Sequence, residues 1–416
     1  MRRISGRTAP AAAVMVATVM VGIMGSAPAA CEEVKVMQGS DFYLYGTENE
    51  GNASSPFARA DAPADWELFP TLYADYTLRF QTPSGVSGQV IASVLGATST
   101  TLVPALDQAW VKATFGEGWG LAFGRRVLND WKDGGYWNPS DVVNNYLSWG
   151  ELGQAPGKDS VELFGLLPFD SLTVDVNAAT VLPASAGSPA DLPFYFTAGS
   201  ILDPVEIRLK AACQSGRLPY LGGAARLTLQ SGALYVDGLW LQDQPFASEF
   251  GFGPSTGSWF RYCAGGNWTI DISQSRLAES LYLQGEYLRQ DDGLDSGQMA
   301  SYFDGLGSMP LATASEQASY GNAAGAWNGR FFALGRDYLY AAFSLGEIAN
   351  AHIGLSACGI LDVDELSFAV QSSLTWSPRN LFSISVSATN FGGRSGGEAS
   401  MLPYAAQYTL TLSRSF

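Results

Sequence analysis

The end of the chain is the segment that most constrains the fold. Residues 408–416 read YTLTLSRSF, so a tyrosine, two leucines and the final Phe416 fall on one side of an extended strand. The threonines and serines between them fall on the other side. A period of two is that of a β-strand. Because most domains end in loosely held polar residues, we expect this amphipathic final strand to face lipid on one side and water on the other.

The start of the chain predicts export. Three arginines lie within the first seven residues, an apolar stretch follows over residues 11–23, and Ala27-Pro28-Ala29 matches the A-x-A cleavage pattern. This pattern is typical of a secretory signal peptide, which we place at residues 1–30. An uncleaved N-terminal membrane anchor is one alternative. Cys31 offers another, a lipoprotein, although Pro28 fits that signal poorly.

The composition favours a membrane β-barrel for residues 31–416. Of the 416 residues 47% are hydrophobic, 12% are aromatic and 15% are charged, whereas soluble domains carry about 25% charged residues. After the signal peptide the sequence contains no stretch of the roughly 20 apolar residues that a spanning helix needs. We therefore predict an all-β fold, a single transmembrane antiparallel up-and-down β-barrel. A large soluble β-helix or sandwich is the alternative.

Alternating segments of about 9–12 residues, the length that crosses a bilayer at a tilt, recur along the chain. The connections between them alternate between long and short, as expected for long extracellular loops and short periplasmic turns. Counting them predicts eighteen strands, with both termini on the periplasmic side. Sixteen is the alternative, because the first strand (about 36–46) and the segment 258–272 are weakly patterned.

A barrel of 16 to 18 strands encloses an aqueous channel, so its inward-facing side chains bear on function. The alternation of side chains along each strand places Asp75, Arg79, Lys112, Glu162 and Asp175 on the inward face. Three basic residues on neighbouring strands, Arg208, Lys210 and Arg226, are expected to be unpaired and to select solutes by charge. The alternative is that a wet wall simply tolerates polar groups. The predicted pore-lining residues are Arg126, Glu206, Arg208, Lys210, Arg226, Glu286 and Arg336.

The long connection after Gly124-Arg125 mixes charge with large aromatic residues. Asn138 can cap a short helix with Pro139 in its first position. Folded inward, this connection would narrow the channel, and its aromatic rings would stack on a ring-shaped or apolar solute. The alternative is an external loop packed on the barrel rim. The candidate constriction residues are Trp131, Asp133, Tyr136, Trp137 and Asp141.

Together, the signal peptide, the strand ladder, Gly124-Arg125 before a long loop and the terminal Phe416 resemble bacterial outer-membrane porins. The Asn138-Pro139 loop is similar to that of poorly characterised porin-like families. The resemblance implies an outer-membrane location, insertion by the barrel assembly machinery and contact with outer-membrane lipid. Arg414 departs from the pattern, since an apolar or aromatic residue usually stands third from the end in the terminal assembly signal.

Other classes of function are disfavoured. The single histidine, His352, placed by parity beside Ser356 on the lumen side, lacks a third partner for catalysis. No cofactor or metal pattern is present, Cys213, Cys263 and Cys358 are not expected to pair, and the net charge of −16 argues against nucleic-acid binding. The residues leave two functions, with the oligomeric state open. One is a channel for passive or substrate-selective diffusion of small hydrophilic solutes. The other is a surface structural or adhesion barrel whose loops bind an external partner.

Overall fold

The computed structural model describes residues 35–52, 55, 66–96, 102–116, 118–128, 135–141, 157–169, 172–182, 192–213, 220–242, 257–275, 277–310, 312–320, 332–349, 351–378, 382–394, 396–402 and 404–415. The predicted signal peptide, Cys31 and Phe416 lie outside these residues.

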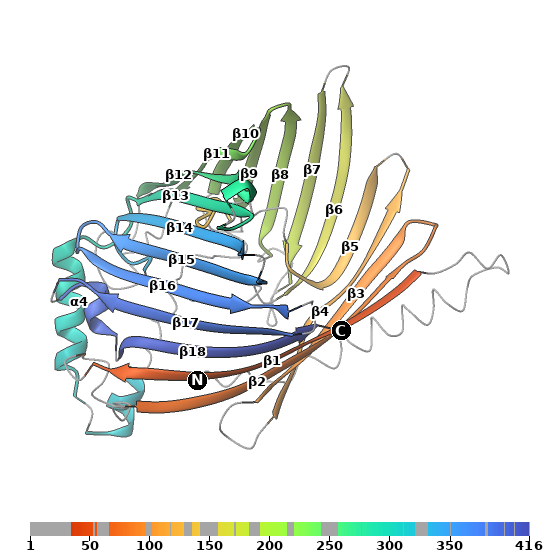
Figure 1. Cartoon of the computed structure of the whole chain (residues 1–416). Helices are drawn as coiled ribbons and strands as arrows, with labels where there is room; N and C mark the ends of the chain where they lie inside the picture. The colour runs from red at the N-terminus through yellow and green to blue at the C-terminus, as the bar shows by residue number, and fades with distance from the viewer. Residues whose placement is uncertain are drawn as a thin grey trace.

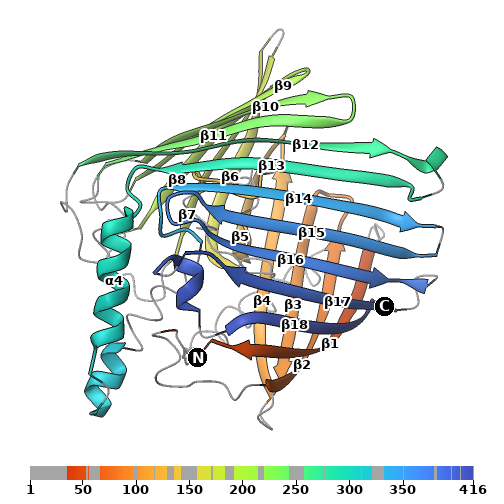
Figure 2. The same ribbon diagram turned by 60° about the vertical axis from the view of Figure 1, so that its left-hand side comes forward.

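The described strands form one closed antiparallel barrel of eighteen strands (Figures 1 and 2). Each strand pairs with the next along the chain, and β18 pairs with β1 to close the ring. This confirms the predicted fold and excludes the sixteen-stranded alternative. The strands are β1 (Lys35–Gly51), β2 (Trp66–Gln81), β3 (Val86–Gly96), β4 (Leu102–Phe115), β5 (Trp119–Arg126), β6 (Lys158–Phe169), β7 (Leu172–Val181), β8 (Phe194–Leu202), β9 (Val205–Cys213), β10 (Tyr220–Leu229), β11 (Gly232–Gln242), β12 (Ser258–Asp271), β13 (Ser280–Gln290), β14 (Asp337–Ile348), β15 (Ile353–Asp362), β16 (Ser367–Trp376), β17 (Ser383–Gly392) and β18 (Tyr404–Ser415).

Closure of the ring satisfies the backbone of every strand, which is the condition for crossing a bilayer. The outer face is apolar, as the alternation requires: Val386 is 54% exposed and Leu410 is 55% exposed. A soluble monomer rarely exposes so extended an apolar surface, whereas lipid solvates it. No helix among the described residues has the length and apolar character of a membrane span.

Long and short connections alternate around the barrel. Tight turns such as the one between β10 and β11 lie at one end, which we call the periplasmic end, and the long connections lie at the other, the external end. The first strand, Lys35–Gly51, is longer than the segment 36–46 expected from its pattern, because its backbone continues to pair with β2 and β18 beyond residue 46.

The external end carries a helix that the sequence analysis did not foresee. The connection between β13 and β14 contains α4 (Ser296–Ser308), which stands across one end of the barrel in Figures 1 and 2. Asp295 caps this helix through a reciprocal capping box with Gln298. Two short 3-10 helices are η3 (Ser273–Ser275) and η5 (Glu398–Met401), the latter between β17 and β18, and the described residues 314–320 are also helical.

Candidate solute pathway

Part of the connection between β5 and β6 lies inside the barrel. We call residues 135–141 the inward loop. The backbone N–H of Tyr136 donates to Oε1 of Glu286 over 2.5 Å, and that of Trp137 donates to Oε2 over 3.0 Å. Glu286 is on β13, and its side chain also accepts from Tyr235 on β11 and from Gln284. A single carboxylate thus anchors two consecutive peptide groups of the loop to the wall.

A second carboxylate anchors the far end of the inward loop. The backbone N–H of Ser140 donates to Oδ1 of Asp237 over 2.7 Å, and its hydroxyl donates to the other oxygen. Lys210 on β9 donates to Oγ of Ser140 over 2.8 Å and lies 3.8 Å from the Asp237 carboxylate. The Lys210 and Asp237 side chains are only 1% and 3% exposed. Charge-assisted hydrogen bonds in such a dry site are strong and directional.

Aromatic rings complete the attachment. The ring of Tyr136 stacks on that of Tyr340 at 4.1 Å between centroids, and Trp137 meets Tyr340 edge-on at 6.0 Å. The carbonyl of Trp137 accepts from the thiol of Cys263 at 3.2 Å. Trp137 is 1% exposed, so it is not available to stack on a solute as the sequence suggested. Its ring serves packing instead.

Two glycines on the wall make room for these contacts. A side chain at Gly222 on β10 would come within 2.8 Å of Cβ of Ser140, so the loop could not approach the sheet. At Gly265 on β12 a Cβ would lie 2.5 Å from Cγ of Glu286. Such distances lie below ordinary carbon–carbon contact, so the absence of a side chain is a condition for seating the loop.

The structure supports the inward placement of the loop but changes its details. Tyr136, Trp137 and Asp141 belong to the described inward loop, whereas Trp131 and Asp133 lie outside the described residues. Asn138 and Asp141 form a turn, in which the Asp141 N–H donates to the Asn138 carbonyl over 2.9 Å.

The expectation of three unpaired cations is wrong. Arg208 forms an ion pair with Glu206 at 3.1 Å, and Lys210 is engaged with Asp237 and the inward loop. Arg226 lies directly opposite Glu206 in the register of β9 and β10. A partly dry wall accommodates basic groups by placing a carboxylate next to them in register.

Two further placements differ from expectation. Arg336 precedes β14 at the external end, where its Nε donates to the carbonyl of Gly293 and it lies 3.5 Å from Asp295, so it does not line the barrel wall. His352 lies in the turn between β14 and β15, 3.3 Å from Glu347, and not on the wall beside Ser356. In both cases strand parity was extended past the end of the strand.

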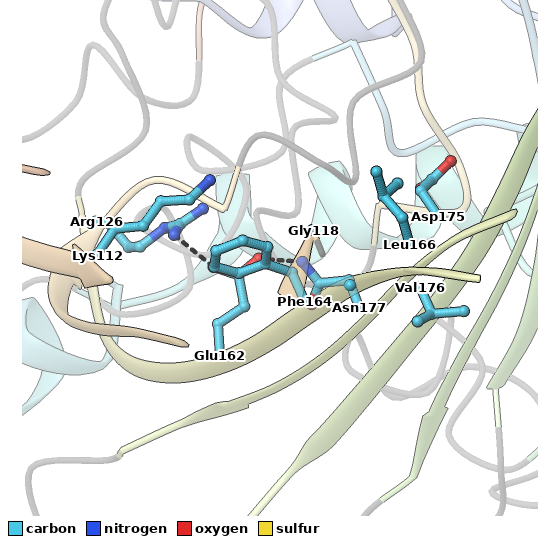
Figure 3. A pocket seen from close by; sticks show the side chains of 10 residues that line it. Lys112, Gly118, Arg126, Glu162, Phe164, Leu166, Asp175, Val176 and Asn177 are labelled. Atoms are coloured by element: carbon cyan, nitrogen blue, oxygen red, sulfur yellow. Dashed lines mark hydrogen bonds and ion pairs between the residues drawn. The ribbon is translucent and has the colours of Figure 1, made fainter. Parts of the chain in front are cut away.

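A cavity of about 220 Å³ opens on the wall formed by β4 to β7 (Figure 3). Arg126 and Glu162 form an ion pair on its floor, and Asn177 donates to the same carboxylate. The Nζ of Lys112 lies 3.9 Å from the centre of the Phe164 ring, a cation–π contact. Asp175 lies at the opposite side of this cavity from Lys112 and Arg126 (Figure 3).

The lumen therefore has two different sides. On β4 to β10 the inward side chains include many charged groups, which we call the charged wall: Lys112, Arg126, Glu162, Asp175, Glu206, Arg208 and Arg226. On β14 to β18 and β1 a row of hydroxyls lies in continuous register, which we call the hydroxyl wall: Ser344, Ser356, Ser373, Ser387, Thr409 and Thr47.

The hydroxyl wall pairs with itself. Ser356 and Ser373 hydrogen-bond at 2.8 Å, and Thr47 and Thr409 at 3.4 Å. Along β15 to β18, the described inward positions on the periplasmic side of Asp362 carry no acidic or basic side chain. The sequence signal was present in the serines of 383–387 and in the threonines of the last strand. That these hydroxyls form one continuous row could be recognised only from the register that aligns the strands.

Within the described part of the chain, no group of three or more histidine, cysteine, aspartate or glutamate side chains is arranged to hold a metal ion. Cys213, Cys263 and Cys358 form no disulfide with one another in the described part of the chain.

Comparison with known proteins finds similar structures but no similar sequences. No protein-family model matches the sequence, and no curated protein sequence matches it. Solved structures do share its fold. OccAB1 of Acinetobacter baumannii has 10% identity over 94% of this chain and 99% of that one, with a TM-score of 0.55. OccK2 (OpdF) of Pseudomonas aeruginosa, solved in complex with glucuronate, has 12% identity over 92% and 98%, with a TM-score of 0.53.

A third structure, OccK11 (OpdR) of Pseudomonas aeruginosa, has 8% identity over 92% of this chain and 96% of that one, with a TM-score of 0.52. At these identities the likeness shows the fold. The resemblance to porin-type barrels seen in the sequence is confirmed at that level.

Proposed function

We propose that this protein is an outer-membrane channel through which small hydrophilic solutes diffuse, with the inward loop setting its aperture. The observation that carries the proposal is the seating of residues 135–141 on Asp237 and Glu286. A barrel of eighteen strands is wide enough to enclose water. A loop fixed by buried carboxylates against one side narrows that space to a defined opening.

The charged wall supports a substrate-selective version of this function. Its ion pairs and the cavity between β4 and β7 expose charges of both signs to the lumen, and such walls tune ion and solute selectivity. A neighbour in fold was solved with glucuronate, a small hydrophilic sugar acid. That solute is compatible with the proposed class, and Arg208 and Arg226 are the residues that we would test for selectivity.

The proposal includes a route to the membrane. Residues 1–30 act as a signal peptide, and the barrel assembly machinery inserts residues 31–416 into outer-membrane lipid. The apolar outer face of the strands supports the membrane location. Arg414 faces outward near the end of β18, where a charge close to the headgroups costs about 0–1 kcal/mol.

Planar-bilayer conductance of the purified barrel tests the function. Steady open current, together with swelling of liposomes in small sugars, amino acids and anions, is the expected result. The alternative function, a surface barrel whose connections bind an external partner, draws its support from α4 across the external end. A persistently closed barrel in both assays would overturn the channel and favour that alternative.

A further inference from the structure

Three segments at the external end meet at one buried glutamate. Glu398, in η5 between β17 and β18, is 0% exposed. Its Oε1 accepts from the backbone N–H of Phe332 over 2.6 Å, and its Oε2 accepts from the hydroxyl of Tyr338 over 3.0 Å. Phe332 belongs to the connection between β13 and β14, and Tyr338 is on β14. One carboxyl group thus joins connections that are far apart in the sequence.

The backbone that Glu398 holds is strained. Phe332 has a φ of 55°, the left-handed region that non-glycine residues rarely adopt, and its side chain is fully buried. Such a conformation costs about 1–3 kcal/mol and persists only where surrounding contacts over-determine it. The hydrogen bond from the Phe332 N–H to Glu398 is one of those contacts. A carboxylate accepts this bond at least as well as a carboxylic acid, so ionisation of Glu398 would act on the cap through the cost of a buried charge and not through loss of this contact.

A second buried carboxyl lies beside the first. Asp362, at the end of β15, is 0% exposed, and its Oδ1 accepts the N–H groups of Asp364 and Glu365. A Cβ built at Gly335 would lie 2.7 Å from Oδ2 of Asp362 and 2.9 Å from the Tyr338 hydroxyl, so this oxygen also faces the tyrosine.

Neither carboxyl has a basic partner among the described residues. Two uncompensated charges in a dry site are too costly for both to be ionised. Burial raises the pKa of Glu398 well above the usual range of a glutamate, and the charge of Asp362 raises it further.

The residues around Glu398 contact the inward loop through a shared hydrophobic cluster. We call the described residues of the connection between β13 and β14 the external cap: 291–310, 312–320 and 332–336. Its buried residues Met299, Phe303 and Phe332 belong to one hydrophobic cluster with Trp137 of the inward loop. The ring of Tyr338 lies between these parts, 6.2 Å from Trp137 and 6.5 Å from Phe332. A displacement of the cap therefore removes packing from the loop.

We propose that Glu398 is a proton-operated lock: in its protonated form it holds the external cap closed, and its ionisation releases the cap and loosens the inward loop. The cap movement stands on the contacts above. Its effect on current rests in addition on the proposed channel function.

The direction of the response follows from the raised pKa. A carboxyl whose folded-state pKa is raised contributes stability that is complete below its unfolded pKa of about 4.3 and is lost as the pH rises through the folded value. The other titratable groups near Glu398 are Asp362, Tyr338 and Glu365, the last beside the neighbouring Gly397, whereas Asp364 and Arg394 are exposed. Ionisation of any of these acids opposes ionisation of Glu398, so all of them favour the same direction. The cap is tight at acid pH and loosens as the pH rises.

Hydrogen exchange of the full barrel in bilayer nanodiscs tests the lock. Rates in residues 294–308 and 332–336, corrected for the intrinsic pH dependence of exchange, are measured between pH 5 and 9. In the wild type we expect protection of the cap to fall at least tenfold across this range. In Glu398→Gln, which keeps an acceptor oxygen but cannot ionise, we expect the fall in protection to shrink to the part that Asp362 contributes, because burial raises the pKa of that aspartate to about 7.

Asp291→Asn is the control, because that carboxylate is solvent-exposed and pairs with Arg289 outside the cluster. It should behave as the wild type. Asp362→Asn, which removes the neighbouring charge, should move the response to lower pH. The proposal is overturned if wild-type protection does not change with pH, or if Glu398→Gln retains the full response.

Current recorded from the same proteins separates the two proposals. If no protein conducts but the exchange response is present and depends on Glu398, the lock stands and the channel function fails. If the wild type conducts while exchange of the cap is independent of pH, the channel stands and the lock fails.

Discussion

The charged wall and the hydroxyl wall face the same water but are held together in different ways. On the charged wall, basic groups have acidic partners nearby: Arg126 pairs with Glu162 on the neighbouring strand, and Arg208 pairs with Glu206 on its own strand. On the hydroxyl wall, like groups bond to like: Ser356 to Ser373 and Thr47 to Thr409. A hydroxyl both donates and accepts, so identical side chains satisfy each other, whereas like charges directly opposite repel.

This difference teaches where specificity can arise. The charged wall presents fields of both signs, and next to it, on β9 and β11, lie the lysine and the carboxylate that fix the inward loop at Ser140. Along β15 to β18, on the periplasmic side of Asp362, the hydroxyl wall presents no acidic or basic side chain at the described inward positions. We therefore expect changes on the charged side to alter the aperture and the selectivity, and changes on the hydroxyl side to leave both almost unchanged.

The largest effect should come from detaching the inward loop. In Asp237→Ala/Glu286→Ala the loop loses both anchors, and Lys210 becomes a buried charge without its carboxylate, which costs about 3–5 kcal/mol. Cys263, 1% exposed beneath Trp137, reports the detachment. In a background where the other cysteines are serine, a hydrophilic thiol reagent should label Cys263 at least about 100-fold faster than in the parent, since each 1.4 kcal/mol is about tenfold.

Asp175→Ala is the matched control for this experiment, because that aspartate lies on the charged wall at the cavity between β4 and β7 and is not one of the two loop anchors. It should label at the parent rate. Equal labelling of the double variant and the parent would show that the two carboxylates do not hold the loop.

A smaller effect is expected on selectivity. Lys112→Gln and Arg226→Gln each remove one positive charge from the charged wall, so the reversal potential in a salt gradient should move toward cation preference. Two unit charges 4 Å apart interact by about 1 kcal/mol in bulk water, which corresponds to about a fivefold change in the permeability ratio. Thr411→Val, on the other side of the lumen, serves as control. A shift toward anions, or equal shifts in all three variants, would contradict the assignment of selectivity to the charged wall.

The smallest effect is expected on the hydroxyl wall. Ser373→Ala removes the hydrogen bond to Ser356, and a typical bond of this kind contributes about 0.5–1.5 kcal/mol to stability. Because water in the lumen can replace it, the loss should lie at the low end, and the reversal potential should not move. Urea unfolding in lipid vesicles measures the loss of stability, and planar-bilayer recording measures the reversal potential. A selectivity change as large as that of Lys112→Gln would remove the distinction between the walls.

The strand ladder could be predicted from the sequence because each strand carries its own signal. Alternation in segments such as 383–389 and 408–415 marks an inward and an outward face without any knowledge of neighbours, and the loop lengths supply the count. For the loop at Tyr136 and Trp137 the sequence left two placements open, inside the barrel or packed on its rim, because aromatic residues suit both.

The anchors could not be predicted in the same way. Lys210 and Asp237 lie on strands separated by β10, and they meet only because Gly222 leaves space for Ser140 between them. Glu398 and Phe332 are 66 residues apart. The alternation along a strand predicts which face a side chain occupies. Its contact partner depends on the register between strands and on the path of a connection, and a local sequence pattern records neither. For this reason Arg208 and Lys210 were expected to be unpaired.

The central claim is that the inward loop, anchored by Asp237 and Glu286, sets the aperture of an open channel. Single-channel conductance of the wild type and of Asp237→Ala/Glu286→Ala, recorded in the same planar bilayers, tests it most directly. The account predicts a steady open current in the wild type and a larger, noisier current in the variant. Identical conductance in the two proteins, or no current in either, would contradict it.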